Sequence, residues 1–159
     1  MSAFCIRLAR RSDAPVIARM SRDLIETGLG WSWTPQRVAR SLRDPNANVI
    51  VASVQQRVVA FALMKYLENE AHLLLFAVTP ARRRTGLGRA MMAWLDETVL
   101  VAGIGTIELE VRARNAGARG FYRHLGFAEC EVIDGYYRGV EAAVRMRRRL
   151  WSTQDSRAR

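Results

Sequence analysis

The most constraining stretch of the sequence joins an apolar segment to a helical pattern through a turn rich in arginine and glycine, over residues 71 to 92. Residues 71 to 78 have the bulk and branching of a buried strand. After the turn, Leu87, Met91, Trp94 and Leu95 recur at helical spacing. A strand that leads directly into a helix directs the unpaired N–H groups of the first helical turn outwards.

This turn predicts an anion site. Gly86 and Gly88 let the backbone approach a bulky phosphate, and the helix dipole adds partial positive charge. Arg83, Arg84 and Arg89 supply further charge. The turn has neither the Gly-Lys-Ser/Thr of a Walker loop nor the third small residue of a dinucleotide fingerprint. On these residues alone, an ordinary tight turn with solvated arginines remains an alternative.

Length and composition favour one domain. A chain of 159 residues, half of them hydrophobic, can build a core, and no apolar run reaches the length of a membrane span.

The first residues lack a signal-peptide pattern. Cys5 and Cys130 lie in apolar, strand-like segments, so we expect free buried thiols rather than a disulfide. Together these features predict a cytoplasmic protein.

The net charge is +10 and is carried almost wholly by arginine, with Lys65 as the single lysine. Such a charge can mark a nucleic-acid or ribosome surface. It can also reflect an arginine-biased genome together with one phosphate-rich cofactor site. The second interpretation is favoured, because no basic stripe interleaved with aromatic residues is present.

Periodicity and turn signals predict an α+β domain with one mixed sheet over residues 1–151, followed by a disordered polar tail over 152–159. Thr34 and Asn115 are expected helix caps. The expected strands are 4–8, 49–54, 58–67, 71–78, 106–112, 127–133 and 142–150. The expected helices begin near residues 13, 35, 88 and 115.

Residues 106 to 112 alternate strictly between apolar and charged side chains, which puts Glu108, Glu110 and Arg112 on one side of a strand. Taken alone, this pattern also suits a solvated strand face, and Tyr122 also suits a core position with its hydroxyl at the rim. His72 and His124 are interpreted as structural or surface residues. No group of residues has the spacing of metal ligands.

The order Arg83-x-x-Gly86-x-Gly88 after Val78-Thr-Pro80 resembles the acyl-CoA-binding signature of the GNAT superfamily of N-acetyltransferases. Leu109-Glu-Val-Arg-Ala-Arg-Asn115, followed by Phe121-Tyr-Arg-His-Leu-Gly-Phe127, resembles its RimI-like branch of protein N-terminal (ribosomal-protein-alanine) acetyltransferases. The resemblance covers nearly the whole chain. It implies a GNAT-type fold, a central mixed, mostly antiparallel twisted sheet with helices on both faces.

The resemblance also implies roles for individual residues. Glu110 would be the general base and Tyr122 the general acid, with no metal required. Trp31, Tyr136 and Tyr137 would contact the acceptor, although the segment 134–141 is shorter than the usual loop of that branch. Coenzyme A would be bound by Phe76, Ala77, Val78, Arg83, Arg84, Thr85, Gly86, Leu87, Gly88, Arg89 and Asn115.

The chemistry of acetyl transfer requires these residue types. An amine attacks a thioester as the free base but is mostly ammonium near neutral pH, so a carboxylate has to accept a proton. The departing thiolate has a pKa of about 8.5, and a well-placed phenol can protonate it.

The resemblance therefore implies an acetyl-CoA-dependent N-acetyltransferase that acts on a protein N-terminal amine, as a monomer or homodimer. No membrane partner is expected, and nucleic acid is not favoured. The alternatives are a small-molecule amine acetyltransferase and a non-catalytic acyl-CoA-binding module.

Overall fold

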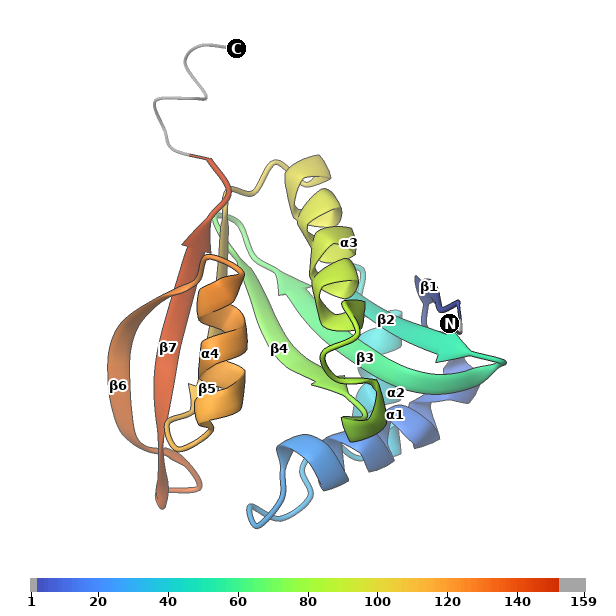
Figure 1. Ribbon diagram of the computed structural model, residues 1–159, viewed down its shortest axis with the longest axis horizontal. Coiled ribbons are helices and arrows are strands. Elements are labelled where there is room, and N and C mark those ends of the chain that lie inside the picture. The colour runs from blue at the N-terminus through green and yellow to red at the C-terminus, as the bar shows by residue number, and fades with distance from the viewer. Residues whose placement is uncertain (1–2, 152–159) are drawn as a thin grey trace. The chain divides into compact units, whose positions relative to one another are not determined.

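The computed structural model describes residues 3–151, which divide into two compact units. Unit 1 contains the residues up to Lys65 together with Leu74–Leu95, and unit 2 contains Tyr66–Leu73 and the residues from Asp96 onwards. The strand order β1-β2-β3-β4-β5-β7-β6 forms a seven-stranded sheet (Figure 1). The β4–β5 pair is parallel, whereas β1–β2, β2–β3, β5–β7 and β6–β7 are antiparallel. The predicted α+β fold with a mixed, mostly antiparallel sheet is confirmed.

Unit 1 places two helices against one face of its strands. Its elements are β1 (Cys5–Leu8), α1 (Ala14–Met20), α2 (Pro35–Arg43), β2 (Ala47–Val54), most of β3 (Arg57–Tyr66), the end of β4 (Ala71–Val78) and the start of α3 (Leu87–Val101). Ile17 of α1, Val38 of α2 and Phe61 of β3 are fully buried in one hydrophobic cluster. Ile50 of β2, one residue out of phase, points to the opposite face, where Figure 1 shows α3 in front of the strands.

The N-termini of α2 and α4 follow local sequence rules for helix capping. The Thr34 side chain accepts a hydrogen bond from the Arg37 backbone N–H, and Pro35 begins α2. In unit 2 the Asn115 side chain likewise accepts from the Ala118 N–H, 3.1 Å away, at the start of α4 (Ala116–His124). Both predicted caps are therefore confirmed.

Unit 2 is built on β5 (Thr106–Arg112), β6 (Ala128–Tyr137) and β7 (Glu141–Arg149), with the first residues of β4 paired to β5. Figure 1 shows α4 in front of β5 and β7. Asp96 and Arg148 form an ion pair, and the same guanidinium donates to the Leu125 carbonyl. This pair links the second half of α3, the end of α4 and β7.

Two expectations are corrected by the structure. Cys5 and Cys130 are free, as predicted, but both are exposed rather than buried, because they lie on β1 and β6, the two terminal strands of the sheet order. β6 continues to Tyr137, so the segment expected to be a loop over 134–141 shortens to a turn at residues 138–140. The predicted tail, 152–159, lies outside the described residues.

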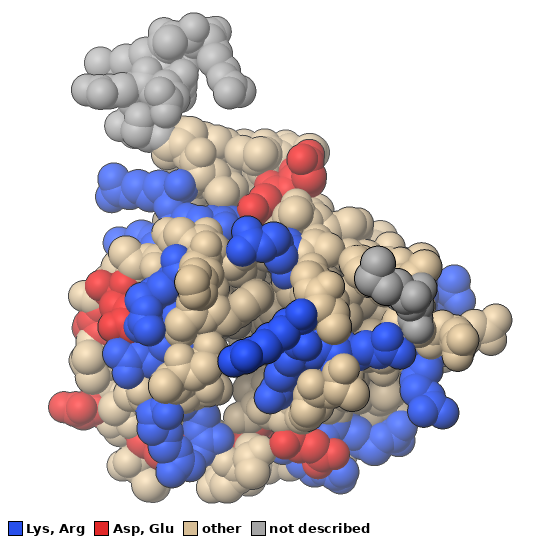
Figure 2. Space-filling view, viewed as in Figure 1, with Lys and Arg blue, Asp and Glu red and all other residues tan. Residues whose placement is uncertain are grey.

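The surface carries the charge that the composition predicts. Figure 2 shows more Lys and Arg than Asp and Glu atoms on the face drawn. Within residues 3–151, none of the helices combines the length and the apolar character needed to cross a membrane.

Candidate active site

The arginine-rich turn of unit 1 follows the end of β4 at Val78. Its backbone is held by side chains of the turn itself: Arg83 Nε donates to the Val78 carbonyl oxygen over 3.2 Å, and Thr85 Oγ1 donates to the Arg82 carbonyl oxygen over 2.5 Å. Arg84 adopts a positive φ of 60°, which turns the chain toward the helix. The guanidinium groups of this turn consequently start from an ordered backbone.

Gly86 marks the start of α3. Its carbonyl oxygen accepts from the Ala90 N–H over 3.0 Å, so the N–H groups of residues 87 to 89 have no partner within the helix. Gly86 has a φ of +84°, and no atom beyond its two chain neighbours lies within 4 Å of the position that a Cβ would occupy. Leu87 is buried and anchors the helix, whereas Arg83, Arg84 and Arg89 are exposed.

This arrangement suits a phosphate or pyrophosphate group. Open space over a glycine, outward N–H groups and three exposed guanidinium groups supply room, donors and positive charge together. Residues 79 to 89 contain no carboxylate that would repel an anion. The residues present therefore fit the diphosphate of coenzyme A.

A second ordered loop in unit 1 carries Trp31. The indole Nε1 donates to the Ala18 carbonyl oxygen over 3.1 Å, and the Arg22 guanidinium lies 5.3 Å from the ring centroid. Trp31 itself is exposed, so its ring is available to a ligand although its N–H is engaged. Its contact with the acceptor stays a prediction.

The loop that contains Trp31 is held by Glu26, which sequence reasoning did not single out. Its carboxylate is 8% exposed and accepts hydrogen bonds from the Ser21 hydroxyl, the Ser32 N–H and hydroxyl, and the Trp33 N–H. Burial alone would raise the pKa of Glu26, but these donors, Ser32 foremost, bring the net pKa below its usual value. The ionised carboxylate of Glu26 thus supplies the acceptor oxygens for N–H groups of this loop.

In unit 2 the strand register brings the charged side of β5 opposite a basic strand. Glu110 is paired directly with Arg145 of β7, and Glu108 with Arg147. Such directly opposed acid–base pairs stabilise a sheet. On the other side of β5, His72 of β4 is in register with Glu108. The face predicted from alternation is confirmed, but it is not the solvated face that remained an alternative: Glu108 is 8% exposed and the Glu110 side chain 6%.

Glu110 is held from both sides. Its Oε2 lies 2.5 Å from His72 Nε2, and its Oε1 accepts from Arg145 Nε over 3.0 Å. Burial would raise the pKa of Glu110, but the hydrogen bond and charge of His72, followed by those of Arg145, lower it overall. The hydrogen bond to Glu110 in turn raises the pKa of His72, against the opposing effect of burial. At neutral pH Glu110 is ionised and is hydrogen-bonded to the imidazole of His72.

His72 was missed at the sequence level, where it was interpreted as a structural or surface residue. A single polar side chain in the apolar segment 71–78 was the available signal. Its partner lies 38 residues further along the chain, and the parallel register of β4 and β5 brings them together.

Tyr122 lies on α4 and is buried. Its ring packs edge-to-face against Phe121 and Phe127, with centroids 5.3 and 5.7 Å away. Burial, and secondarily the nearby Tyr137, raises the pKa of the Tyr122 phenol well above its usual value. The hydroxyl is therefore protonated throughout the neutral range, as a proton donor must be before it acts.

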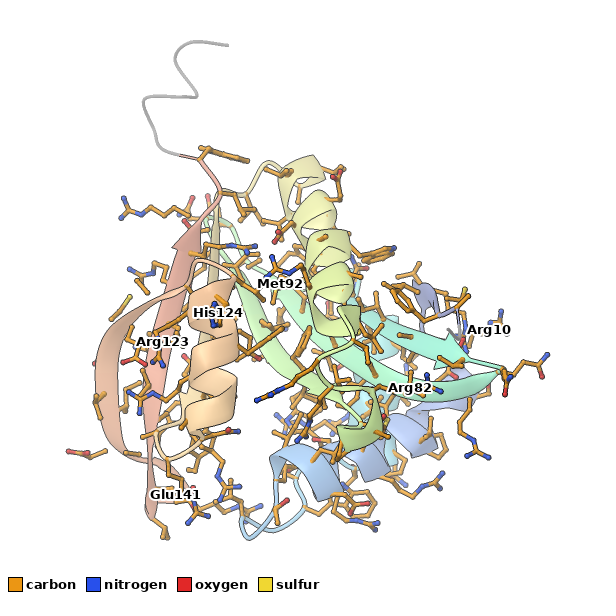
Figure 3. All side chains as sticks on the ribbon, in the orientation of Figure 1. Arg10, Arg82, Met92, Arg123, His124 and Glu141 are labelled. Atoms are coloured by element: carbon orange, nitrogen blue, oxygen red, sulfur yellow. The ribbon has the colours of Figure 1, made fainter. Side chains whose placement is uncertain are left out.

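Tyr136 and Tyr137 lie at the end of β6, with ring centroids 4.9 Å apart. Burial raises the pKa of both phenols, and the charge of Glu110 raises both further. The turn beside them is fixed by Glu141, which binds Arg112 and Arg114 and is labelled at the start of β7 in Figure 3. Unit 2 thus gathers His72, Tyr136 and Tyr137 around the carboxylate of Glu110.

Asn115 occupies a different setting. It is exposed, and its side-chain oxygen is used in the cap of α4. Its predicted contact with coenzyme A stays a prediction, as do the contacts predicted for Phe76, Ala77 and Val78. Ala77 is buried, while Phe76 and Val78 are half-buried at the end of β4.

Comparison with known proteins gives concordant results. A family model described as the acetyltransferase (GNAT) family matches residues 18–127. The [ribosomal protein bS18]-alanine N-acetyltransferase of Escherichia coli strain K12 is 41% identical over 81 residues, which are 51% of this chain and 55% of that protein. The matched part is therefore little more than half the length of that curated relative.

Two solved structures extend the likeness over the whole fold. The ribosomal-protein-S18-alanine N-acetyltransferase from Escherichia coli superposes with a TM-score of 0.79 at 27% identity, covering 95% of this chain and 96% of that one. The PaiA N-acetyltransferase from Thermoplasma acidophilum, in complex with coenzyme A, gives a TM-score of 0.78 over 92% of this chain and 99% of that one. Its 18% identity makes it a match in fold alone.

Proposed function

Because the chain belongs to the GNAT acetyltransferase family, we propose that it is an acetyl-CoA-dependent N-acetyltransferase whose acceptor is a protein N-terminal amine. The observation that carries the proposal is the ionised carboxylate of Glu110, fixed by His72 and Arg145 and neighboured by Tyr136 and Tyr137. A reaction that must deprotonate an ammonium group needs such a proton acceptor.

Acetyl-CoA is the proposed cosubstrate and supplies the activated acetyl group when bound. The Gly86 turn fits its diphosphate through open space, free helix N–H groups and the guanidinium groups of Arg83, Arg84 and Arg89. The remaining proposed contacts are Phe76, Ala77, Val78, Thr85, Leu87, Gly88 and Asn115. The coenzyme A complex of the PaiA N-acetyltransferase, a match in fold, agrees with this choice.

The proposed proton transfers use residues of unit 2. Glu110 accepts a proton from the incoming ammonium group, and His72 holds Oε2 of that carboxylate in place across the 2.5 Å contact. Tyr122 keeps its proton at neutral pH and is the proposed donor to the leaving thiolate. Because its raised pKa makes the phenol a weak acid, this donation depends on close placement rather than on acidity.

The proposed acceptor is based on the similarity to the bS18-alanine N-acetyltransferase of Escherichia coli, which is 41% identical over 51% of this chain. Trp31, Tyr136 and Tyr137 are the proposed acceptor contacts, and a cytoplasmic location suits a protein acceptor. The short turn after Tyr137 keeps a small-molecule amine as the runner-up acceptor.

The test is an acetyl-transfer screen across peptides with different N-terminal residues and a panel of small amines, with release of free thiol as the readout. Turnover on peptides supports the proposal. Turnover confined to small amines would show that the acceptor is a small-molecule amine and not a protein N-terminus. Acetyl-CoA binding in calorimetry without turnover on either panel would identify a non-catalytic acyl-CoA-binding module instead.

A further inference from the structure

Arg145 lies on β7 between two strands that each present a carboxylate to it. In the sheet register it is opposite Glu110 of β5 on one side and Glu131 of β6 on the other. Its Nε lies 3.0 Å from Glu110 Oε1 and 3.2 Å from Glu108 Oε1, and its Nη1 lies 2.8 Å from Glu131 Oε2. One guanidinium therefore bridges three carboxylates.

The charges around Glu110 form a defined set, which we call the charge cluster: Glu108, Glu110, Glu131, Arg145, Arg147 and His72. Without a proton on His72, this set contains three carboxylates and two guanidinium groups. A protonated imidazole adds a third cation, and the hydrogen bond to Glu110, together with the charges of Glu110, Glu108 and the nearby Glu70, favours this charged form of His72. Arg145 is the member that contacts all three carboxylates.

We infer that Arg145 is a positioning residue for proton transfer, which holds Oε1 of Glu110 so that Oε2 faces His72. The inference rests on the proposed function, because it assigns a role to Glu110. A carboxylate bound through one oxygen cannot rotate away from the imidazole without breaking a charge-assisted hydrogen bond. Arg145 also keeps Glu110 ionised, since a cation at this distance favours the charged form of a carboxyl group.

Other groups near Glu110 also influence its charge. The phenols of Tyr136 and Tyr137 on β6 are neutral near pH 7, and Glu108 on the same strand repels a second negative charge. His72 on β4 and Arg145 on β7 are the two partners that lower the pKa of Glu110. Removal of the Arg145 cation should therefore raise the proton affinity of both Glu110 and His72.

Arg147 provides a matched control. It lies two residues further along the same face of β7, and its guanidinium donates to Glu108 Oε2 over 2.6 and 3.1 Å. Its register partner on β6 is Ala128, where Arg145 has Glu131. Loss of Arg147 thus removes a comparable ion pair from the strand without removing a contact to Glu110.

The first experiment measures proton binding and needs no turnover. The chain has two histidines, so an NMR titration of the imidazole resonances separates His72 from His124, which is exposed on α4 and labelled in Figure 3. In Arg145→Met the pKa of His72 should rise by about half a unit or more. In Arg147→Met it should rise clearly less.

The second experiment uses the pH dependence of kcat/KM on the best acceptor. In Arg145→Met the acid limb should move to higher pH, and Arg145→Lys, which keeps a charge but not the three-way bridge, should restore it in part. Acetyl-CoA affinity should stay unchanged. If Arg145→Met does not fold, Glu131→Gln is the second variant. It removes one exposed carboxylate that competes with Glu110 for Arg145, and the pKa of His72 should then fall.

Equal titration and kinetic behaviour of the Arg145 and Arg147 variants would overturn the inference, because both arginines would then be plain structural ion pairs. An unchanged His72 titration in Glu131→Gln would overturn it in the fallback case. A shifted His72 titration in a protein that acetylates nothing would instead refute the proposed function and leave the arrangement of Arg145, Glu110 and His72 established.

Discussion

His72 Nε2 and Glu110 Oε2 lie 2.5 Å apart on the neighbouring parallel strands β4 and β5. This contact places an imidazole beside the carboxylate that would deprotonate the acceptor. It raises the pKa of His72 and lowers that of Glu110, so both groups favour their charged forms near pH 6. The pair therefore connects the pH dependence of stability with that of the proposed reaction.

Replacement of Glu110 should slow the reaction. Glu110→Gln keeps the size of the side chain but removes the proton acceptor, and the rate at pH 7 should fall by roughly 10²-fold. Higher pH should restore part of it, because more of the amine is then unprotonated. A pH–rate profile with a good acceptor measures both effects, with Glu97→Gln on exposed α3 surface as the control. A near-normal rate at pH 7 would show that the base is elsewhere.

Replacement of Tyr122 should affect turnover rather than binding. Tyr122→Phe keeps the ring between Phe121 and Phe127 but removes the hydroxyl, so kcat should fall by about tenfold or more while acetyl-CoA affinity stays near normal. Higher pH should not restore the rate. Tyr66→Phe, which removes a hydroxyl bonded to Thr98 in the same unit, is the matched control. If Tyr122→Phe is silent, the thiolate leaves without this donor.

Substitution in the turn before α3 should weaken cofactor binding. Gly86→Glu introduces a negative charge at the proposed diphosphate site, and acetyl-CoA affinity in calorimetry should fall at least about tenfold, or about 1.4 kcal/mol. Gly103→Glu controls for backbone strain, because Gly103 also has a positive φ, of +76°, and open space around its Cβ position. Equal affinities for the two variants would remove the turn from the cofactor site.

The pair of His72 and Glu110 should give stability that depends on pH. The raised pKa of His72 contributes stability that is fully present below about pH 6.5 and lost as pH rises through the folded-state value. The lowered pKa of Glu110 contributes stability above about pH 4.3 that is lost as pH falls. Urea unfolding should therefore show a larger cost of His72→Asn at pH 5.5 than at pH 9.

The buried carboxylate of Glu26 should stabilise unit 1. Glu26→Gln turns one acceptor oxygen into a donor facing the donors of Ser21, Ser32 and Trp33, and unfolding free energy should fall by about 1–3 kcal/mol. Tryptophan fluorescence, to which Trp31 contributes as one of the four tryptophans of the chain, should shift as this loop loosens. Glu68→Gln at an exposed site is the control. Unchanged stability would mean that the loop is held by the Trp31–Ala18 hydrogen bond instead.

Much of the fold could be predicted because its signals are local. The strands Ala71–Val78 and Thr106–Arg112 have the predicted bounds, because the first is a nearly continuous apolar run that ends before Thr79-Pro80 and the second alternates between apolar and charged side chains. Thr34 and Asn115 cap helices through hydrogen bonds that span three residues. β6 was predicted too short, because Tyr136 and Tyr137 are exposed or half-buried and follow Gly135, so no apolar run marked their strand.

The sequence by itself determined the order of elements, the outward N–H groups in the first turn of α3 and the side of β5 on which Glu110 lies. The tertiary structure alone decided the partners of Glu110. Its contacts to His72 and Arg145 join residues 38 and 35 positions apart, so they depend on sheet register rather than on spacing in the chain. The charge state of a carboxylate follows from what surrounds it, because burial and neighbouring cations act in opposite directions, and that balance arises when the strands pair.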